Sequence, residues 1–339
     1  MIDVLVVEDS AFMRKVISEI LESDPEIKVV DNAINGLDGV KKASLLKPDV
    51  ITMDIEMPHM DGIEAVKEIM KSNPTPIIMI SAYTKKGAQK TIETLIAGAV
   101  DFIEKPGGPI SLNIRDIKEK IIEKVKIASE ANLKTAVKRK KISLDKNRKM
   151  DDSLVIIAAS TGGPKILTSI FKKLPGDFPA PIVVVQHMPK TFTKAFAKRL
   201  DDKSPISVTE GKEGSFLNKC KAYVAPGDYH LEFDHDRRIK LNKKPALHGV
   251  RPSADITMNS AVENFDGNLI GVILSGMGKD GTIGVRNISK RGGYVIAQDK
   301  DTSVVHGMPK SAIESGCVDI ILPYNGIAEK LVSLVKKDV

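Results

Sequence analysis

The strongest constraint on the fold is a regular alternation between short apolar runs and segments of helical periodicity. Strands inside a parallel sheet are covered on both faces and therefore carry few polar residues. Within the first 125 residues, apolar runs followed by helical segments occur at 2–7, 28–30, 50–53, 76–80 and 99–103. This alternation predicts an open, parallel α/β sheet with helices on its faces.

Polar side chains follow these strands at the points where the strands end. They are Glu8 and Asp9 after the first strand, Asp54 after the third, Ser81 after the fourth and Lys105 after the fifth. We expect them to lie together, because the carboxyl ends of parallel strands meet at one edge of a sheet. Clustered carboxylates repel one another unless a hard cation such as Mg²⁺ is bound between them. Asp54 would then be placed to accept a phosphoryl group as a nucleophile.

Asp54 opens the motif Asp-Ile-Glu-Met-Pro-His-Met-Asp-Gly, and with it the first part of the chain closely resembles a response-regulator receiver domain. The resemblance implies a flavodoxin-like (βα)5 fold. It also implies that Asp54 is phosphorylated by a histidine kinase and holds Mg²⁺ together with Glu8 and Asp9. Ser81 and Lys105 would carry the response to phosphorylation.

Composition divides the chain into two domains and a basic linker. A chain of 339 residues, 42% hydrophobic and 28% charged, is long enough for two globular domains. Residues 130–150 hold eight basic residues against two acidic ones, a large part of the net charge of +7. We interpret this segment as a solvated linker and expect no nucleic-acid partner, because only 4% of residues are aromatic. The predicted boundaries are 1–125 for the receiver domain, 126–152 for the linker and 153–339 for the second domain.

Nothing in the sequence predicts secretion or membrane insertion. Cys220 and Cys317 are the only cysteines and lie far apart, so we expect two free thiols in a reducing compartment. The amino terminus, MIDVLVVEDS, lacks the basic segment of a signal peptide. No apolar run approaches the roughly 18–20 residues that a membrane span needs. These features predict a cytoplasmic protein.

The second domain opens on a buried strand, 154–158, that is followed by Ser160 and a Gly-rich turn. Later apolar runs alternate with helical segments, which predicts a second doubly wound parallel sheet. We expect Pro164 to be the first helical residue and Gly163 the N-cap, which leaves the Ser160 hydroxyl without a capping role. Ser160 would lie beside unpaired N–H groups at a helix start, where anions are stabilised. Taken alone, the stretch fits an ordinary strand-to-helix turn better than a catalytic one.

Three polar residues of the second domain follow three of its expected strands. They are Ser160, His187 and Asp280. A neutral histidine can take the proton of a serine hydroxyl, and a carboxylate can hold that histidine in the required tautomer. The order along the chain differs from the familiar serine hydrolases, and the G-x-S-x-G motif is absent. The histidines that compete with His187 for the role of base are His59, His230, His235, His248 and His306.

The loop that contains Asp280 supports a competing interpretation. Gly276, Gly278 and Gly281 have the spacing of a dinucleotide-binding loop, and Asp299 ends the next expected strand. This pattern would make the second domain an NAD-dependent enzyme. Asp280 argues against it, because its negative charge would stand where the pyrophosphate binds. The spacing excludes a Walker A loop.

Six motifs of the second domain together resemble the chemotaxis protein-glutamate methylesterase/protein-glutamine glutaminase family, in which a receiver precedes the catalytic domain. The motifs are Ala-Ser-Thr-Gly-Gly-Pro at 159–164, Gln-His-Met-Pro at 186–189, Ala-Pro-Gly at 225–227, Arg-Pro-Ser-Ala-Asp at 251–255, Gly-Met-Gly-Lys-Asp-Gly at 276–281 and Ala-Gln-Asp at 297–299. The resemblance implies that Ser160 is the nucleophile, His187 the general base and Asp280 the carboxylate that orients it.

The same resemblance implies a substrate and a mode of control. Substrates would be γ-glutamyl methyl esters, and certain glutamines, of chemoreceptors, hydrolysed without a cofactor. Met277 would border the oxyanion site, and from the turn geometry we infer that Thr161 or Gly162 donates a backbone N–H to it. Phosphorylation of Asp54 would move the receiver away from the active-site edge. A partner-docking module and a DNA-binding regulator that uses the basic segment 138–149 stay open as alternatives.

Overall fold

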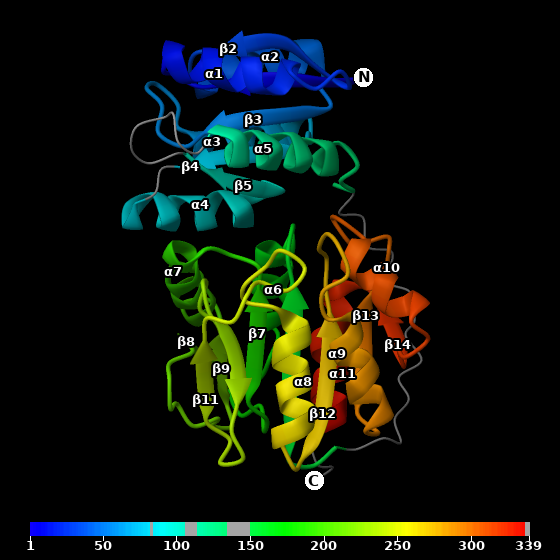
Figure 1. Cartoon of the computed structure of the whole chain (residues 1–339). Coiled ribbons are helices and arrows are strands. Elements are labelled where there is room, and N and C mark those ends of the chain that lie inside the picture. The colour runs from blue at the N-terminus through cyan, green and yellow to red at the C-terminus, as the bar shows by residue number, and fades with distance from the viewer. Residues whose placement is uncertain (82–83, 106–113, 134–149, 336–339) are drawn as a thin grey trace. The chain divides into compact units, whose positions relative to one another are not determined.

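The computed structural model describes residues 1–81, 84–105, 114–133 and 150–335. The chain divides into two compact units, Met1–Leu133 and Lys134–Val339, and each is described by itself (Figure 1). The linker predicted over 126–152 falls mainly on residues 134–149, which lie outside the described part of the chain.

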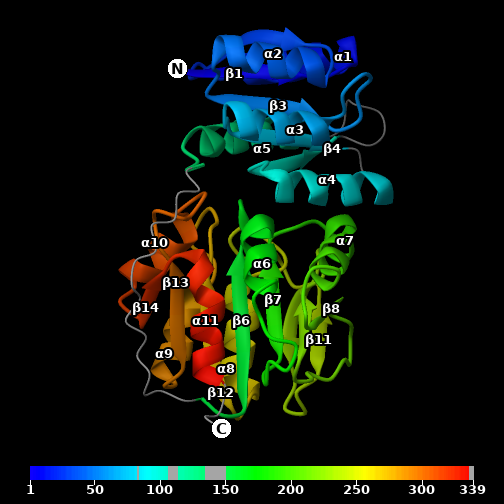
Figure 2. The ribbon, with the colours of Figure 1, turned by 180° about the vertical axis from the view of Figure 1, so that it is seen from behind.

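The first unit is a five-stranded parallel sheet with helices on both faces, which confirms the predicted α/β class. Its elements are β1 (Ile2–Val7), α1 (Ala11–Glu22), β2 (Ile27–Ala33), α2 (Gly36–Leu46), β3 (Val50–Asp54), α3 (Gly62–Ser72), β4 (Ile77–Ser81), α4 (Lys85–Ala97), β5 (Asp101–Glu104) and α5 (Ile114–Ser129). The strand order is β2-β1-β3-β4-β5, that of flavodoxin-like sheets. Helices α1 and α5 pack together on one face, and α2, α3 and α4 lie on the other (Figure 2).

Local sequence explains where the helices of the first unit begin. Side chains of four N-cap residues accept a hydrogen bond from the first turn of the next helix; they are Ser10, Asn35, Asp61 and Thr84. At Asp61 the capping is reciprocal, because the Glu64 carboxylate accepts from the N–H of Asp61. All four residues follow strands, so the polar caps lie at the edge where the candidate side chains gather.

The second unit is built around a seven-stranded parallel sheet in the order β14-β13-β12-β6-β7-β9-β8. Its elements are β6 (Ser153–Ala159), α6 (Gly163–Phe171), β7 (Ile182–Gln186), α7 (Lys190–Asp201), β8 (Ser207–Glu210), β9 (Lys221–Val224), β10 (His230–Phe233), β11 (Ile239–Asn242), α8 (Ala254–Asn264), β12 (Asn268–Ile273), α9 (Thr282–Lys290), β13 (Tyr294–Gln298), α10 (Gly307–Glu314), β14 (Ile320–Leu322) and α11 (Tyr324–Val335). The central strand β6 is buried at every position.

Three elements of the second unit lie where the sequence predicts none. They are α7, β8 and β10. Helix α7 buries Phe192, Phe196 and Leu200 at helical spacing, but lysines and threonines between them obscure the pattern. Strands β8 and β10 have four residues each, too few to show a clear alternation. Strand β10 pairs with β11 in a separate antiparallel hairpin.

The second sheet reverses its strand order between β6 and β12. The chain leaves β6 toward β7 on one side and leaves β12 toward β13 on the other. In open α/β sheets, such a reversal forms a crevice outside the carboxyl ends of the strands. Ser160 follows β6, His187 follows β7 and the loop 274–281 follows β12. The topology therefore brings the three predicted residues of the second domain to one crevice.

One local expectation at Ser160 is wrong by one residue. Helix α6 begins at Gly163 with Gly162 as its N-cap, whereas the sequence suggests Gly163 as the cap and Pro164 as the first helical residue. Gly162 adopts a φ of 78°, and the N–H of Gly163 donates to the Ser160 carbonyl at 2.8 Å, so the turn closes one residue earlier. Pro164 fits the second position because N–H groups in the first turn have no helical acceptor.

Candidate active site and phosphorylation site

The carboxyl edge of the first sheet brings together Glu8, Asp9, Asp54 and Lys105. Oxygen atoms of the three carboxylates lie within 4.8 Å of one another. Lys105 Nζ lies 2.9 Å from Asp54 Oδ2 and 3.0 Å from Glu8 Oε2. Carboxylate oxygens are the ligands that Mg²⁺ prefers, and Asp9 is exposed while the other two carboxylates are buried. The residues present therefore fit the metal ion that a receiver implies.

Burial is the largest single influence on the pKa of Asp54, Glu8 and Lys105. It raises the pKa of Asp54, against the charge of Lys105 and the hydrogen bond that Lys105 donates. The pKa of Glu8 is also raised, by burial and then by the charge of Asp54. Burial acts to lower the pKa of Lys105, but the two carboxylates outweigh it and the pKa is raised. A cation here would offset the repulsion between the carboxylates.

Ser81 ends β4 at the same edge and contacts helix α4. Its hydroxyl lies 2.6 Å from that of Thr91, and Thr91 Oγ1 donates to the Gly87 carbonyl at 2.7 Å. Because Thr91 uses its proton on Gly87, Ser81 is the donor between the two hydroxyls. The N–H of Lys105 donates to the Ser81 carbonyl at 2.7 Å, so the two predicted switch residues are in direct contact.

Ser160 and His187 are adjacent because β6 and β7 are neighbouring parallel strands. The N–H of His187 donates to the Ala159 carbonyl at 3.0 Å, and Gln186 Nε2 donates to the Ser160 carbonyl at 2.9 Å. Within the described residues, no hydrogen bond joins the Ser160 hydroxyl to the His187 ring. Catalytic hydrogen bonds are often long without substrate and tighten in the complex. The backbone thus places the two side chains beside each other.

His187 Nε2 lies 2.8 Å from Asp280 Oδ2. Asp280 is 2% exposed and accepts three more hydrogen bonds, from Ser253 Oγ at 2.7 Å, the Ala254 N–H at 2.7 Å and the Asp255 N–H at 3.1 Å. These donors belong to the amino end of α8, where the helix dipole favours negative charge. Burial acts to raise the pKa of Asp280, but the bond and charge of His187 and the donors of α8 outweigh it and hold the pKa at about 2. Asp280 is therefore ionised at neutral pH.

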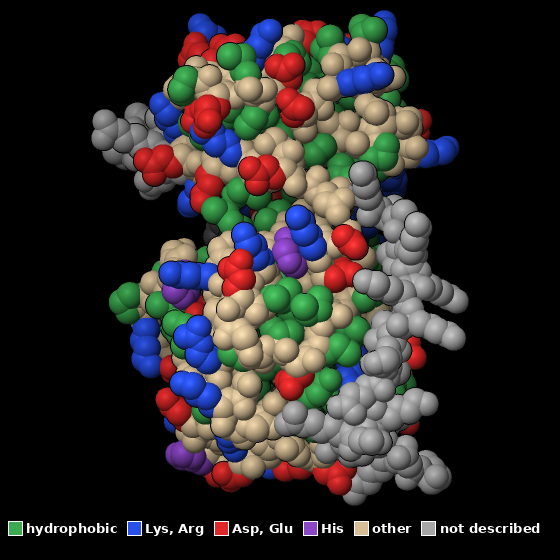
Figure 3. Space-filling model, turned by 90° about the vertical axis from the view of Figure 1, so that its right-hand side faces the viewer, with side chains coloured by type: hydrophobic (Ala, Val, Ile, Leu, Met, Phe, Trp, Pro, Cys, Tyr) green, Lys and Arg blue, Asp and Glu red, His purple; other side chains and the backbone are tan. Residues whose placement is uncertain are grey.

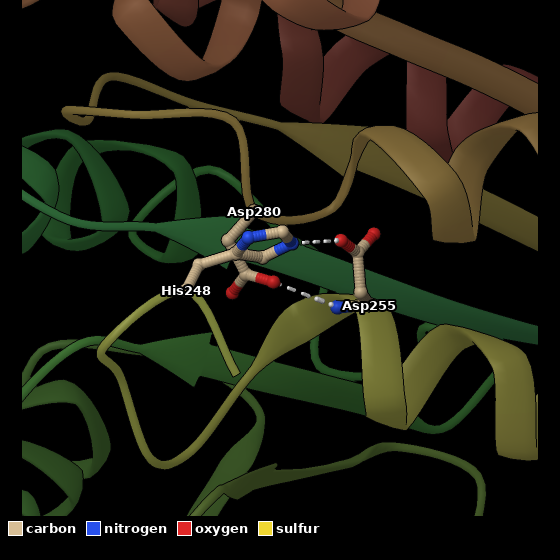
Figure 4. Close-up of side chains that lie close together, drawn as sticks. All are labelled: His248, Asp255 and Asp280. Atoms are coloured by element: carbon tan, nitrogen blue, oxygen red, sulfur yellow. Dashed lines mark hydrogen bonds and ion pairs between the residues drawn. The ribbon is translucent and has the colours of Figure 1, made fainter. Parts of the chain in front are cut away.

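A second histidine–carboxylate pair supports Asp280 (Figure 4). His248 Nε2 lies 3.1 Å from Asp255 Oδ2, and Asp255 Oδ1 accepts from the N–H of Gly284 at 2.8 Å. Burial raises the pKa of Asp255, and nearby Asp280 raises it further. Ligand atoms of His248 and both carboxylates lie within 4.8 Å of one another. Each carboxylate oxygen already has a hydrogen-bond partner, so we interpret the cluster as support for α8 and α9 rather than as a metal site.

Thr161, Gly162 and Met277, predicted to border the oxyanion site, lie on turns that flank Ser160. Gly162 is the N-cap of α6, and Met277 follows Gly276, where an added Cβ would lie 2.8 Å from Ser160 Cβ. Among the described residues, the N–H groups of Gly162 and Met277 have no acceptor. Both are available to bind a developing negative charge.

The role of the motif at 251–255 is a feature that sequence reasoning missed. Its Ser253 donates its hydroxyl to Asp280, and the N–H of Ser253 donates to His230 Nδ1 at 3.2 Å. His230 is fully buried, with Nε2 3.1 Å from the Pro245 carbonyl, and burial lowers its pKa. The sequence signal for this role was Ser253 at the start of an expected helix, because the hydroxyl of such a residue can donate to a nearby anion.

The loop 276–281 does not have the environment of a dinucleotide site. Asp280 is buried against α8, so the loop turns inward at the point where a pyrophosphate would have to approach. The Asp299 carboxylate accepts hydrogen bonds from the N–H and the hydroxyl of Thr302. Both bonds go to Asp299 Oδ1 and tie the carboxylate to its own loop.

Comparisons with known proteins resolve the family. The model for the CheB methylesterase matches residues 155–331, and the model for the response regulator receiver domain matches residues 4–115. The chain belongs to the CheB methylesterase family. The match to the receiver model confirms the receiver domain predicted for the first part of the chain, and the NAD-dependent alternative is not favoured.

Relatives of this family cover almost the whole chain. Proteins named protein-glutamate methylesterase/protein-glutamine glutaminase include one from Pyrococcus abyssi, 48% identical over 99% of this chain and 94% of its own length. Another, from Thermotoga maritima, is 49% identical over 98% of both chains. The crystal structure of the Thermotoga maritima CheB methylesterase catalytic domain aligns with a TM-score of 0.53 at 48% identity, over 54% of this chain and 99% of that one.

The surface charges and the helix lengths bear on whether nucleic acid or a membrane is a partner. Figure 3 shows lysine and arginine side chains interspersed with aspartate and glutamate on the face in view. Across the described residues, every helix is too short or too polar to cross a bilayer. The basic segment 138–149, which a DNA-binding interpretation would use, lies outside the described part of the chain.

Proposed function

We propose that this member of the CheB family hydrolyses γ-glutamyl methyl esters of chemoreceptors, and deamidates certain receptor glutamines, in the cytoplasm. Family membership and the full-length relatives named for both activities support this proposal. The observation that carries it is the hydrogen bond of His187 to the buried, ionised Asp280, beside Ser160 at the carboxyl edge of a parallel sheet.

The pairing of His187 and Asp280 determines which ring nitrogen acts as the base. Ionised Asp280 can only accept, so His187 Nε2 carries the proton of their hydrogen bond. His187 Nδ1 then has a lone pair for the hydroxyl proton of Ser160. Ser160 Oγ attacks the ester or amide carbonyl, and the proton on Nδ1 passes to the leaving methanol or ammonia. Water, activated by the same nitrogen, hydrolyses the acyl-enzyme and releases glutamate.

The tetrahedral intermediates carry a negative oxygen that needs donors. We propose the N–H groups of Gly162, on the turn after Ser160, and of Met277, next to a glycine that contacts Ser160, because neither has an acceptor among the described residues. One such donor typically lowers the barrier by about 3–4 kcal/mol. Thr161 lies on the same turn and is the alternative that the sequence suggested.

The first unit would control this activity through phosphorylation of Asp54. Glu8, Asp9 and Asp54 would hold Mg²⁺, which supplies positive charge that shields the acyl phosphate and its donor. Lys105, already 2.9 Å from Asp54, would bind a phosphoryl oxygen. Ser81 would leave Thr91 to donate to another phosphoryl oxygen. A chemotaxis histidine kinase would be the phosphodonor, and the response would relieve a restraint on the second unit.

Methanol release from methyl-esterified receptor membranes tests the proposal directly. Wild type, Ser160→Ala and the control Ser260→Ala would be compared with and without acetyl phosphate and Mg²⁺. Ser260 is also a buried serine, but its hydroxyl accepts from the Phe233 N–H, away from His187 and Asp280. We expect release by wild type and Ser260→Ala, stimulated by the phosphodonor, and none by Ser160→Ala. Release that persists in Ser160→Ala would refute the esterase mechanism.

A further inference from the structure

Ser275 is a fully buried serine that links three loops of the candidate active site. Its Oγ donates to the Thr161 carbonyl at 2.8 Å, with the Val305 carbonyl as a longer second acceptor at 3.2 Å, and accepts from the Val305 N–H at 3.0 Å. Its own N–H donates to Gln298 Oε1 at 2.8 Å, and its carbonyl accepts from the Ser160 N–H at 3.0 Å. Each polar group of Ser275 is therefore hydrogen-bonded.

The turn after Ser160 has a geometry that depends on the orientation of one peptide. The N–H of Gly163 bonds to the Ser160 carbonyl, and Gly162 has φ 78° and ψ −10°, close to the values of the third residue in a type II turn. Type I and type II turns differ by a flip of the central peptide, here the one between Thr161 and Gly162. The positive φ of Gly162 corresponds to the type II orientation.

The contact with Ser275 holds that central peptide in place. In a trans peptide the C=O and N–H groups point in opposite directions. Because the Thr161 carbonyl points at the buried Ser275 hydroxyl, the N–H of Gly162 points the other way, away from Ser275. If the peptide flipped, the carbonyl oxygen would take the place of this donor, and a carbonyl repels an oxyanion.

We propose that Ser275 is a positioning residue for the oxyanion site: its hydroxyl holds the Thr161–Gly162 peptide in the orientation that presents the Gly162 N–H to the tetrahedral intermediate. This inference rests on the proposed esterase function. The hydroxyl of Ser275 bonds to neither Ser160 nor His187, so its loss should act through the stabilisation of the intermediate. Loss of its hydroxyl should lower kcat and leave substrate affinity in place.

The test compares Ser275→Ala, Ser275→Thr and Ser260→Ala in the full-length protein. The substrate is a soluble peptide with one glutamate γ-methyl ester, and the inhibitor is a peptide boronic acid that forms a tetrahedral adduct with a catalytic serine. We expect Ser275→Ala to lower kcat about tenfold to a hundredfold and to leave KM within about twofold of wild type. The affinity for the boronic acid should fall by about the same factor as kcat. Ser275→Thr keeps the hydroxyl and should recover most of kcat, and Ser260→Ala should behave as wild type.

The outcomes separate this inference from the proposed function. Equal effects of Ser275→Ala and Ser260→Ala, or a loss that appears in KM while boronic acid binding is unchanged, would overturn the role of Ser275. No hydrolysis of the ester by wild type would instead overturn the esterase function itself, and activity that survives Ser160→Ala would overturn the role of Ser160 as nucleophile. Urea unfolding of each variant identifies a folding defect, and if Ser275→Ala does not fold, Ser275→Cys, with its weaker donor, should give an intermediate kcat.

Discussion

At the scale of single residues, environment rather than residue type sets the chemistry of the carboxylates. Asp280 and Asp255 are both almost fully buried, yet burial raises the pKa of Asp255 whereas the pKa of Asp280 is about 2. The difference follows from the donors, because Asp280 accepts four hydrogen bonds, one of them from His187. Asp280 therefore keeps its charge, which a partner that orients His187 requires.

The low pKa of Asp280 predicts a pH-dependent contribution to stability. Its folded-state pKa of about 2 lies below the 3.8 of an unperturbed aspartate, so the contribution is fully present above pH 3.8 and is lost as pH falls through 2. The shift corresponds to about 2 kcal/mol. We expect the difference in free energy of unfolding between wild type and Asp280→Asn, measured in urea, to shrink from pH 5 to pH 2. A difference that stays constant over this range would contradict the assigned pKa.

At the scale of elements, the site depends on helix starts. The amino end of α8 supplies three donors to Asp280, and the amino end of α6 follows the turn that holds Ser160. Parallel strands bring both helix starts to the same edge, where their dipoles favour negative charge. The elements therefore contribute electrostatic stabilisation as well as position.

The geometry at the start of α6 predicts that a side chain at Gly162 lowers the free energy of unfolding. An added Cβ would lie 2.6 Å from Val304 Cβ, on a backbone with φ of 78°. Gly316 has φ of 73° but no atom within 4 Å of such a Cβ, so it serves as the control. We expect Gly316→Ala to lose about 1–2 kcal/mol of unfolding free energy from backbone strain, and Gly162→Ala to lose about 1–3 kcal/mol more from overpacking. If thermal or urea unfolding shows the same loss of free energy for both variants, the contact with Val304 does not destabilise Gly162→Ala, which would contradict this prediction.

At the scale of the whole molecule, two units with similar topology carry separate chemistry. Each is a parallel sheet with candidate residues at its carboxyl edge, and a reversal of strand order occurs in each. In the first, the edge gathers oxygen ligands and a lysine; in the second, it gathers a hydroxyl, an imidazole and a carboxylate. One fold class thus supports a proposed phosphoacceptor and a proposed hydrolase, because the side chains at the edge determine the reaction.

If the first unit controls the second, basal activity and its stimulation by a phosphodonor should be lost through different substitutions. Asp54→Asn removes the proposed phosphoacceptor but leaves Ser160 and Asp280 intact, so basal methanol release should match wild type while stimulation by acetyl phosphate and Mg²⁺ disappears. Glu22→Gln, a change at an exposed carboxylate on α1, is the control and should retain stimulation. Stimulation that persists in Asp54→Asn would place the effect of the phosphodonor elsewhere.

The sequence by itself determined the class of both folds and the edge at which chemistry gathers. Apolar runs such as the one that ends at Ala159, when they alternate with helical segments, are typical of strands in a parallel sheet, and the residues after such strands share an edge. Tertiary structure decided which side chains meet there. The bond of His187 to Asp280 spans 93 positions, and the contact of Ser275 with Thr161 spans 114. Such contacts depend on side-chain direction and on loops whose conformation no periodicity encodes, so only the folded chain specifies them.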